Sequence, residues 1–280
     1  MSKGYSTGQT VVVTGAAGGI GAAIAARFAA EARVLSLWDR ESAVHAVAAD
    51  LAQRAVDRAV AAGRDKAWDA AESVHGVEVD VCDAEAVRTA FDRFGAAHGP
   101  ADVVVHAAGV MVGGNALELD AAEWTRCLTV NATGTMLVTQ RAATEMVAAG
   151  RGSIVVVSSN AAAMPRVNMA AYGAAKAAAT AYTKALALQV APLGVRVNLV
   201  SPGSTDTAML REMFGGDRID AAAETALLDG DPTVYRLGIP LRRIAAPADI
   251  AETVYFLASE GARHITMHDL RVDGGATLDM

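Results

Sequence analysis

The 280-residue sequence contains little cysteine, histidine or aromatic residue, and these shortages narrow what the protein can be. Two cysteines, Cys82 and Cys127, are too few for a disulfide framework and do not have the spacing of a metal-binding pair. The six histidines are scattered, and no two of them form a zinc-like motif, so no metal site is predicted. Aromatic residues make up 5% of the chain, whereas alanine and glycine are abundant, a composition that suits helices packed closely on a sheet.

An excess of positive charge is also missing. Lysine and arginine total 24 against 31 aspartates and glutamates, which gives a net charge of -7. An acidic chain is a poor candidate for binding nucleic acid or an anionic membrane, so we expect neither as a partner. The first residues, MSKGYSTGQTVVVTG, lack the apolar core of a signal peptide, and no uninterrupted apolar run reaches about 18 residues. We expect a soluble, cytoplasmic protein.

What the sequence does contain is an alternation of short apolar runs and longer helical stretches. Each run is rich in β-branched residues and almost continuously apolar, which is typical of strands buried on both faces of a parallel sheet. The expected strands are 10–15, 33–39, 76–81, 102–109, 152–159, 195–203 and 270–275. The expected helices are 19–31, 41–62, 83–98, 121–149, 172–191 and 247–259. This order predicts an α/β fold in one domain: a Rossmann-type, doubly wound parallel sheet flanked by helices on both faces.

Two segments are longer than such a sheet requires. The helical pattern of 41–72 extends beyond an ordinary connecting helix. The irregular segment 204–240 follows the sixth strand, and its length makes it a candidate lid.

A glycine-rich turn follows the first expected strand. Gly15, Gly19 and Gly21 have the spacing TGxxxGxG, which lets backbone N–H groups approach a pyrophosphate at the start of a helix. The second strand ends at Asp39, where a carboxylate can hold both ribose hydroxyls of an adenosine. A carboxylate would repel a 2′-phosphate, so NAD is favoured over NADP. Arg40 weakens this preference slightly, because an arginine could pair with that phosphate.

Two residues near the end of the third strand complete the expected adenosine site. Asp80 is a candidate contact for the adenine amino group, with Val81 beside it. A strand-end turn is an equally good explanation for Asp80.

Motifs distributed along almost the whole chain resemble the short-chain dehydrogenase/reductase family. They are TGAAGGIG (14–21), HAAG (106–109), NATG (131–134), VVVSS (155–159), YGAAK (172–176), SPG (201–203) and VDGG (272–275). Their order and separations are those of the family, and the combination is far more specific than any single motif.

The resemblance implies a catalytic tetrad. Tyr172 matches the general acid/base, Lys176 follows at i+4 on the same helix face, Ser159 stands at the end of a strand, and Asn131 matches the family's asparagine. A free tyrosine has a pKa near 10, and a nearby ammonium together with a positive nicotinamide would favour its phenolate. Ser159 would orient the reacting oxygen, and Asn131 would hold a water that relays protons. Taken singly, Asn131 could be a helix N-cap and Ser159 a turn residue.

The resemblance also implies which residues contact the cofactor, NAD. Lys176 would hold the nicotinamide ribose, and Thr205 and Thr207 would contact the carboxamide and phosphates. The full expected set is Gly15, Gly19, Ile20, Gly21, Asp39, Asp80, Val81, Ala108, Gly109, Tyr172, Lys176, Pro202, Gly203, Thr205 and Thr207. One position departs from the family pattern, because His106 stands where an asparagine usually braces two strands. We expect His106 to take over that bracing, although it could instead perturb the adenosine side.

Two longer stretches, 158–178 and 201–278, are similar to the 2,3-dihydro-2,3-dihydroxybenzoate dehydrogenases. This resemblance implies NAD-dependent oxidation of the C3 alcohol of a cyclohexadiene carboxylate to an aromatic hydroxybenzoate. A carboxylate substrate requires a cation, and Arg166 is the candidate for a bidentate grip, with a solvated loop arginine as the alternative. Ser159 would also contact the substrate. Met164, Met169 and Met209 could form an apolar wall against the ring or serve as ordinary packing.

Other functions remain open at this stage. The same residues suit trans-2,3-dihydro-3-hydroxyanthranilate, whose C2 carries an amine, with 3-hydroxyanthranilate as the product. A broad secondary alcohol or sugar dehydrogenase and a protein that binds NAD without turnover are more remote alternatives. By analogy with the family we expect a homotetramer, assembled through 131–149, 172–191 and the C-terminal strand region.

Overall fold

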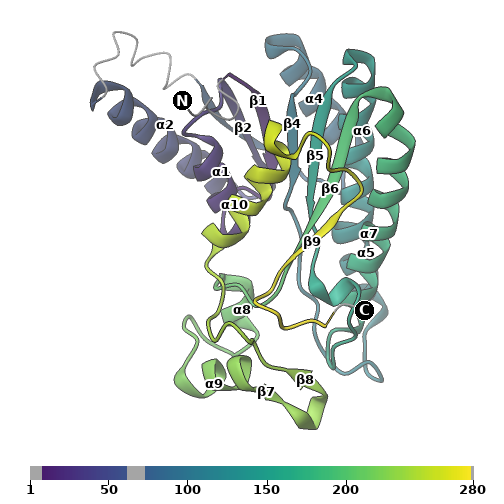
Figure 1. The fold of residues 1–280 in the computed structure, drawn as a ribbon. Coiled ribbons are helices and arrows are strands. Elements are labelled where there is room, and N and C mark those ends of the chain that lie inside the picture. Colours follow the sequence, from purple (N-terminus) through teal and green to yellow (C-terminus); the bar gives the residue numbers. More distant parts are fainter. Residues whose placement is uncertain (1–7, 62–72, 279–280) are drawn as a thin grey trace.

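The computed structural model describes residues 8–61 and 73–278, and its centre is one parallel sheet of seven strands. The strand order is β3-β2-β1-β4-β5-β6-β9 (Figure 1). The strands are β1 (Thr10–Thr14), β2 (Val34–Asp39), β3 (Val74–Glu78), β4 (Val103–His106), β5 (Gly152–Val157), β6 (Val195–Pro202) and β9 (Asp269–Val272). The predicted α/β fold is confirmed. The third strand begins and ends earlier than the predicted 76–81, because Val74 already pairs with Leu35 of β2.

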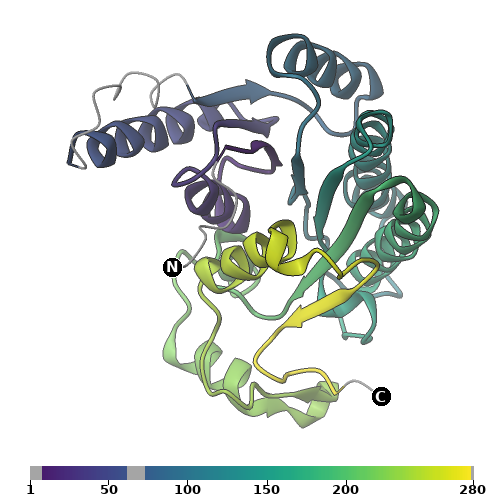
Figure 2. The same cartoon turned by 45° about the horizontal axis from the view of Figure 1, so that its top comes forward.

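Helices cover both faces of the sheet, and Figure 2 separates the two layers. They are α1 (Gly19–Phe28), α2 (Ala43–Ala61), α4 (Ala84–His98), α5 (Ala121–Leu128), α6 (Gly134–Ala149), α7 (Ala170–Val190) and α10 (Pro247–Ala258). Side chains of successive strand residues alternate between the faces. Val11 and Val13 pack with α1, α2 and α10, whereas Val12 and Val104 pack with α4, α6 and α7. The strands therefore bury apolar residues on both sides.

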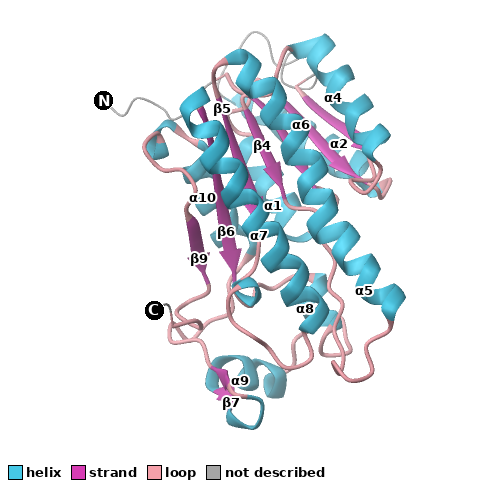
Figure 3. Cartoon of the chain, turned by 90° about the vertical axis from the view of Figure 1, so that its right-hand side faces the viewer, coloured by secondary structure: helices cyan, strands magenta, loops and turns pink. Residues whose placement is uncertain are grey.

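A π-helical turn divides the stretch 121–149, which the sequence predicts as one helix. The turn comprises Thr129–Thr133 and separates α5 from α6, and Figure 3 shows α5, α6 and α7 on one side of the sheet. Asn131 lies in this turn and is fully buried. Its side-chain amide donates to the Cys127 carbonyl at 3.0 Å, a bond that reaches back four residues along the chain. π-Turns are common at functional sites, and this one places a buried amide beside the sheet.

The segment 204–240 forms a small lid beyond the carboxyl ends of the strands (Figure 1). It contains α8 (Ala208–Glu212), α9 (Ala221–Asp229) and an antiparallel pair of two-residue strands, β7 (Gly230–Asp231) and β8 (Arg236–Leu237). Gly230 has φ 84°, and a Cβ there would lie 2.4 Å from the Arg236 carbonyl oxygen. The glycine is thus required for the hairpin to close.

The long segment 41–72 is explained only in part. Its first portion is α2, and residues 62–72 lie outside the described residues. Within the described ranges, no helix combines the length and apolar character needed to cross a membrane.

Candidate active site

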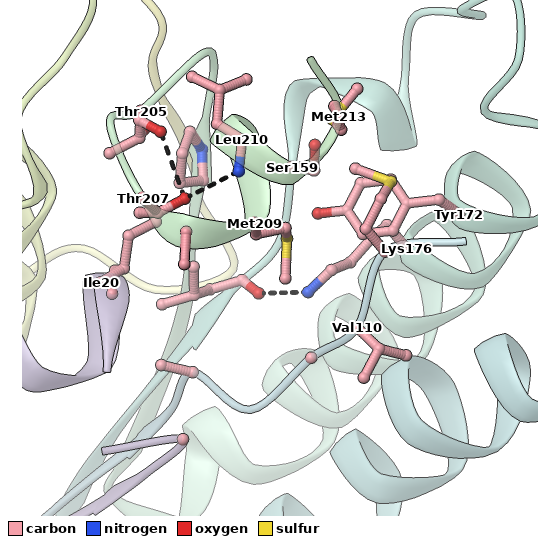
Figure 4. A pocket seen from close by; sticks show the side chains of 18 of the residues that line it. Ile20, Val110, Ser159, Tyr172, Lys176, Thr205, Thr207, Met209, Leu210 and Met213 are labelled. Atoms are coloured by element: carbon pink, nitrogen blue, oxygen red, sulfur yellow. Dashed lines mark hydrogen bonds between the residues drawn. The ribbon is translucent and has the colours of Figure 1, made fainter. Parts of the chain in front are cut away.

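A cleft of about 970 Å³ lies where the carboxyl ends of the strands meet the lid (Figure 4). Its walls come from the turn after β1, from the ends of β2, β4, β5 and β6, and from the lid. Ligands of open α/β sheets bind at this edge, where the connections leave the sheet in opposite directions. The cleft holds all the predicted site residues except Asn131 and Met164.

The glycine turn packs so closely against neighbouring backbone that two of its positions cannot carry a side chain. Gly15 has φ 70°, and a Cβ there would lie 2.6 Å from the Ala108 nitrogen. A Cβ on Gly21 would lie 1.9 Å from the Gly15 carbonyl oxygen. Gly18 is the N-cap of α1, supplies no side-chain acceptor and faces open space. The first N–H groups of α1 therefore point into the cleft, where a phosphate fits the helix dipole.

The opposite end of this turn presents a fixed carboxylate. Asp39 accepts hydrogen bonds from the Ala17 N–H at 3.0 Å and from the Glu41 N–H at 3.1 Å. Arg40 forms an ion pair with Glu41 at 3.0 Å, so its charge is directed to a neighbour. Asp80 lines the cleft and also accepts from the Cys82 N–H at 2.8 Å. Asp80 is therefore a turn residue that also lines the cleft, and its contact with the adenine amino group stays a prediction.

Tyr172 and Lys176 lie together on α7, and burial controls the charge of both. The Lys176 ammonium donates to the Val157 carbonyl at 2.9 Å and lies 5.9 Å from the centroid of the tyrosine ring. Burial lowers the pKa of Lys176 to about 8, so the amine is mostly protonated at neutral pH. Burial raises the pKa of Tyr172 to about 12, although a hydrogen bond with the Ser159 side chain opposes the shift. In the free cleft Tyr172 is a neutral phenol, and the lysine alone does not bring its pKa toward neutrality.

Ser159 and Asn131 are held by different neighbours. Ser159 accepts a hydrogen bond from the Ala161 N–H at 3.1 Å and lies beside the Tyr172 hydroxyl (Figure 4). Asn131 donates to the Val110 carbonyl at 2.9 Å and accepts from the Val110 N–H at 3.3 Å, so its amide fixes the loop after β4. A Cβ on Gly109 would lie 2.8 Å from the Asn131 amide oxygen and 3.3 Å from the lysine nitrogen. Asn131 thus stands behind Gly109 and supports the wall of the cleft.

The remaining cofactor-side residues have specific local bonds. Thr205 donates to the Gly203 carbonyl at 3.2 Å, and Thr207 caps α8 by accepting from the Leu210 N–H at 3.3 Å (Figure 4). Ile20, Val81, Ala108, Pro202 and Gly203 line the same cleft.

The other end of the cleft is basic and apolar. Arg166 and Met169 line it from the loop before α7, and Met209 lines it from α8. Met164 is partly exposed and is absent from the lining, so the structure places it outside the expected apolar wall. A parallel bridge between Gly114 and Met169 joins the loop after β4 to the loop that carries Arg166. The cleft therefore joins the glycine turn and Asp39 to an arginine and two methionines.

Known proteins are similar to this chain in sequence and in fold. A family model described as Enoyl-(Acyl carrier protein) reductase matches residues 15–277. The chain is 43% identical over 202 residues to the Vibriobactin-specific 2,3-dihydro-2,3-dihydroxybenzoate dehydrogenase of Vibrio cholerae, over 72% of this chain and 76% of that protein. It is 37% identical over 273 residues to the 2,3-dihydro-2,3-dihydroxybenzoate dehydrogenase of Bacillus subtilis, over 97% of each. The solved 7 alpha-hydroxysteroid dehydrogenase complexed with NADH and 7-oxo glycochenodeoxycholic acid superimposes with a TM-score of 0.78 at 26% identity, over 98% of this chain and 96% of that one.

The chain belongs to the short-chain dehydrogenase/reductase family. Its relatives carry different substrate names on one fold, so membership makes this protein a dehydrogenase without naming the molecule it oxidises.

His106 is the residue in which this dehydrogenase departs from the family motif. It is buried at the end of β4, and its Nδ1 lies 2.9 Å from the hydroxyl of Thr14 in β1. Burial, with a smaller influence of the Lys176 charge, lowers the pKa of His106 to about 3. Its Nε2 has no hydrogen-bond partner among the described residues. His106 therefore links two neighbouring strands, as we expected from the sequence, and the structure adds that it does so as a neutral imidazole.

The lid contributes residues to the dehydrogenase cleft that sequence reasoning missed. They are Met213, Phe214, Val234 and Arg236. The lid sequence has no period that assigns side chains to a face, so only the folded hairpin shows which of its residues turn inward. One signal was available, since an arginine is suited to bind a carboxylate and the lid candidate contains several arginines.

Proposed function

We propose that this dehydrogenase uses NAD to oxidise the C3 alcohol of a 2,3-dihydro-3-hydroxy cyclohexadiene carboxylate, of the 2,3-dihydro-2,3-dihydroxybenzoate type. One observation carries the proposal: Arg166 shares the cleft with Tyr172, Ser159 and Lys176 and, among the described residues, has no carboxylate within ion-pair distance. A half-buried arginine in that state suits an anionic substrate whose alcohol reaches the tyrosine. The names of the two relatives above support the same substrate class.

A nicotinamide cofactor fits the residues present. Gly18 faces open space at the start of α1, where a pyrophosphate would bind, and Lys176 lines the same cleft and would hold a ribose hydroxyl. Asp39 favours NAD, because its carboxylate would hold the ribose hydroxyls and repel a 2′-phosphate. When bound, the cofactor supplies the hydride acceptor and a positive charge near the tyrosine.

The chain's own residues handle the proton. Tyr172 takes the proton of the C3 hydroxyl while Ser159 orients the oxygen, and the C3 hydride leaves to give a ketone. Loss of the C2 proton then converts the ketone into an aromatic phenol, so each turnover forms one NADH and releases one proton. Because burial holds the pKa of the free Tyr172 at about 12, the phenolate forms only when positive charge accumulates beside it. Lys176, protonated at neutral pH, contributes one such charge.

Two candidate substrates differ only in the substituent at C2. The 2-amino analogue, trans-2,3-dihydro-3-hydroxyanthranilate, undergoes the same oxidation at C3, and we find no described cleft residue that distinguishes an amine from a hydroxyl. We keep the 2-hydroxy acid as the proposal because of the relatives' names.

A side-by-side assay tests the proposal. Purified protein with NAD is given the 2-hydroxy acid, the 2-amino acid and simple secondary alcohols, and both NADH and the aromatic product are measured. We expect the highest kcat/KM with the 2-hydroxy acid and a preference for NAD over NADP. Turnover of simple alcohols with neither acid accepted would contradict the proposal.

A further inference from the structure

The lid hairpin brings a second arginine into the cleft. Arg236 is the first residue of β8, and its guanidinium donates to the Ser204 hydroxyl at 3.0 Å. Ser204 follows β6 and also lines the cleft, as does Val234. An arginine has five N–H donors, so a single hydroxyl leaves most of them available.

Arg236 and Arg166 line the same cleft, and the positive charge of Arg166 acts on Arg236. Both guanidinium groups are partly buried, and neither has a carboxylate within 4.0 Å among the described residues. Burial lowers the pKa of Arg236, and the positive charge of Arg166 lowers it further, while Asp231 opposes the shift. Burial likewise lowers the pKa of Arg166, against the attraction of Asp273. The two cations therefore line one cleft, Arg166 from the loop before α7 and Arg236 from β8.

The acidic groups nearby are already engaged elsewhere. Asp273 accepts from the Asn160 amide at 3.3 Å and from the Gly275 N–H at 3.0 Å. Asp231 accepts from both the N–H and the hydroxyl of Thr233. Two partly desolvated cations that repel each other cost stability unless an anion lies between them. A carboxylate satisfies this requirement, because it accepts hydrogen bonds from two guanidinium groups at once.

We propose that Arg236 and Arg166 together bind the carboxylate of the substrate, so that the lid hairpin forms half of the anion site. This inference rests on the proposed function for the identity of the anion. Arg166 comes from the loop before Tyr172 and Arg236 from the lid, so the anion connects the two walls. A neutral alcohol of the same shape lacks this connection, which makes Arg236 a specificity-determining residue.

Binding measurements test the clamp directly. The probes are 2,3-dihydroxybenzoate and catechol, which differ by the carboxylate, and the dissociation constant of each is measured by calorimetry on the NADH-loaded protein. Wild type should bind the acid more tightly than catechol. Arg236→Gln should lose about 10- to 100-fold of affinity for the acid, with catechol and NADH binding unchanged. Arg166→Gln should behave alike, and the double variant should lose less than the product of the two losses, because both groups serve one carboxylate.

Controls separate charge from lid folding. Arg218 is an exposed lid arginine outside the cleft lining, and Arg218→Gln should leave all three affinities unchanged. Arg236→Lys keeps the charge without the planar fork and should show an intermediate loss, which keeps the test valid if the glutamine variant folds poorly. A purely structural Arg236 would instead lower the melting temperature of the free protein. The clamp predicts an unchanged or higher value, with most of the stabilisation by the acid lost.

Two outcomes would overturn the clamp. The first is that Arg236→Gln prefers the acid over catechol as strongly as wild type does. The second is that Arg236→Gln weakens the binding of NADH and not that of the acid, which would assign Arg236 to the cofactor. Failure of the proposed function has a different signature. Wild type would then turn over neither dihydro acid, while Arg236 would still determine the preference for 2,3-dihydroxybenzoate over catechol. That result would refute the proposed reaction and leave the proposed anion site supported.

Discussion

Mild acid should destabilise this protein through one buried histidine. His106 is neutral in the folded chain, with a pKa of about 3, whereas an unfolded histidine has a pKa near 6.5. As the pH falls below 6.5, the unfolded chain binds a proton that the folded chain does not, so folding is disfavoured. Stability is therefore almost unaffected by this group above about pH 7.5 and decreases progressively as the pH falls through 6.5 toward about 3.

The size of the effect follows from the difference between the two pKa values. At pH 5.0 the unfolded histidine is almost fully protonated, and the loss of folding free energy is about 2 kcal/mol. At pH 7.5 the same calculation gives about 0.1 kcal/mol. The result at pH 5.0 depends mainly on the unfolded pKa, because the folded imidazole stays neutral as long as its own pKa is below about 4.

Urea unfolding of wild type and His106→Asn at the two pH values provides the assay. Asparagine does not titrate and can still bond to Thr14 in the neighbouring strand. The difference in unfolding free energy between the two proteins should shift by about 2 kcal/mol in favour of the variant at pH 5.0, while all other titrating groups cancel. The exposed His264→Asn is the matched control and should show no such shift. A difference that does not change with pH would refute a neutral, buried His106.

Three further changes have expected outcomes. Lys176→Met should abolish turnover yet leave the protein at least as stable at pH 7.5. The pKa of Lys176 is about 8 in the folded chain against 10.5 in the unfolded chain, and this difference lowers the free energy of unfolding at pH 7.5 by about 3 kcal/mol, which the variant would regain. Marked destabilisation of the variant in urea would contradict this. Gly21→Ala should lose NADH binding, since its Cβ would lie 1.9 Å from a carbonyl oxygen, whereas Gly95→Ala, which meets nothing within 4 Å, should bind normally in calorimetry. Asp39→Asn should lower the kcat/KM ratio of NAD to NADP about 10-fold or more, and an unchanged ratio would remove Asp39 from cofactor selection.

The run of apolar residues in the sequence was sufficient to predict those strands whose residues are all buried. Valines of β1, β4 and β5 are buried on both faces, and such runs are recognisable as parallel strands. The edge strand β3 was placed less accurately, because VHGVE mixes polar and apolar residues and its register comes from pairing with β2. The π-turn at Thr129–Thr133 leaves the helical period almost intact, so only its backbone bonds reveal it, such as the one that the Gly134 N–H donates to the Thr129 carbonyl.

Some residues of the candidate site could likewise be predicted from the sequence, and others could not. The glycine turn, Asp39 and the Tyr172–Lys176 pair depend on short-range spacing, and the structure gathers them in one cleft. Arg236 depends on the closing of the lid hairpin, which no periodic pattern encodes. The charge state of Tyr172 was also out of reach, since burial, which determines it, depends on residues from many parts of the chain.

The most direct test of the central claim is hydride transfer in Tyr172→Phe. This variant keeps the ring and removes the hydroxyl that would take the substrate proton. Single-turnover mixing with NAD and the 2-hydroxy dihydro acid should show a loss of about 10³-fold or more in the rate of NADH formation, while NADH binding stays as in wild type. A rate within a few-fold of wild type would contradict the role of Tyr172 and the reaction built on it.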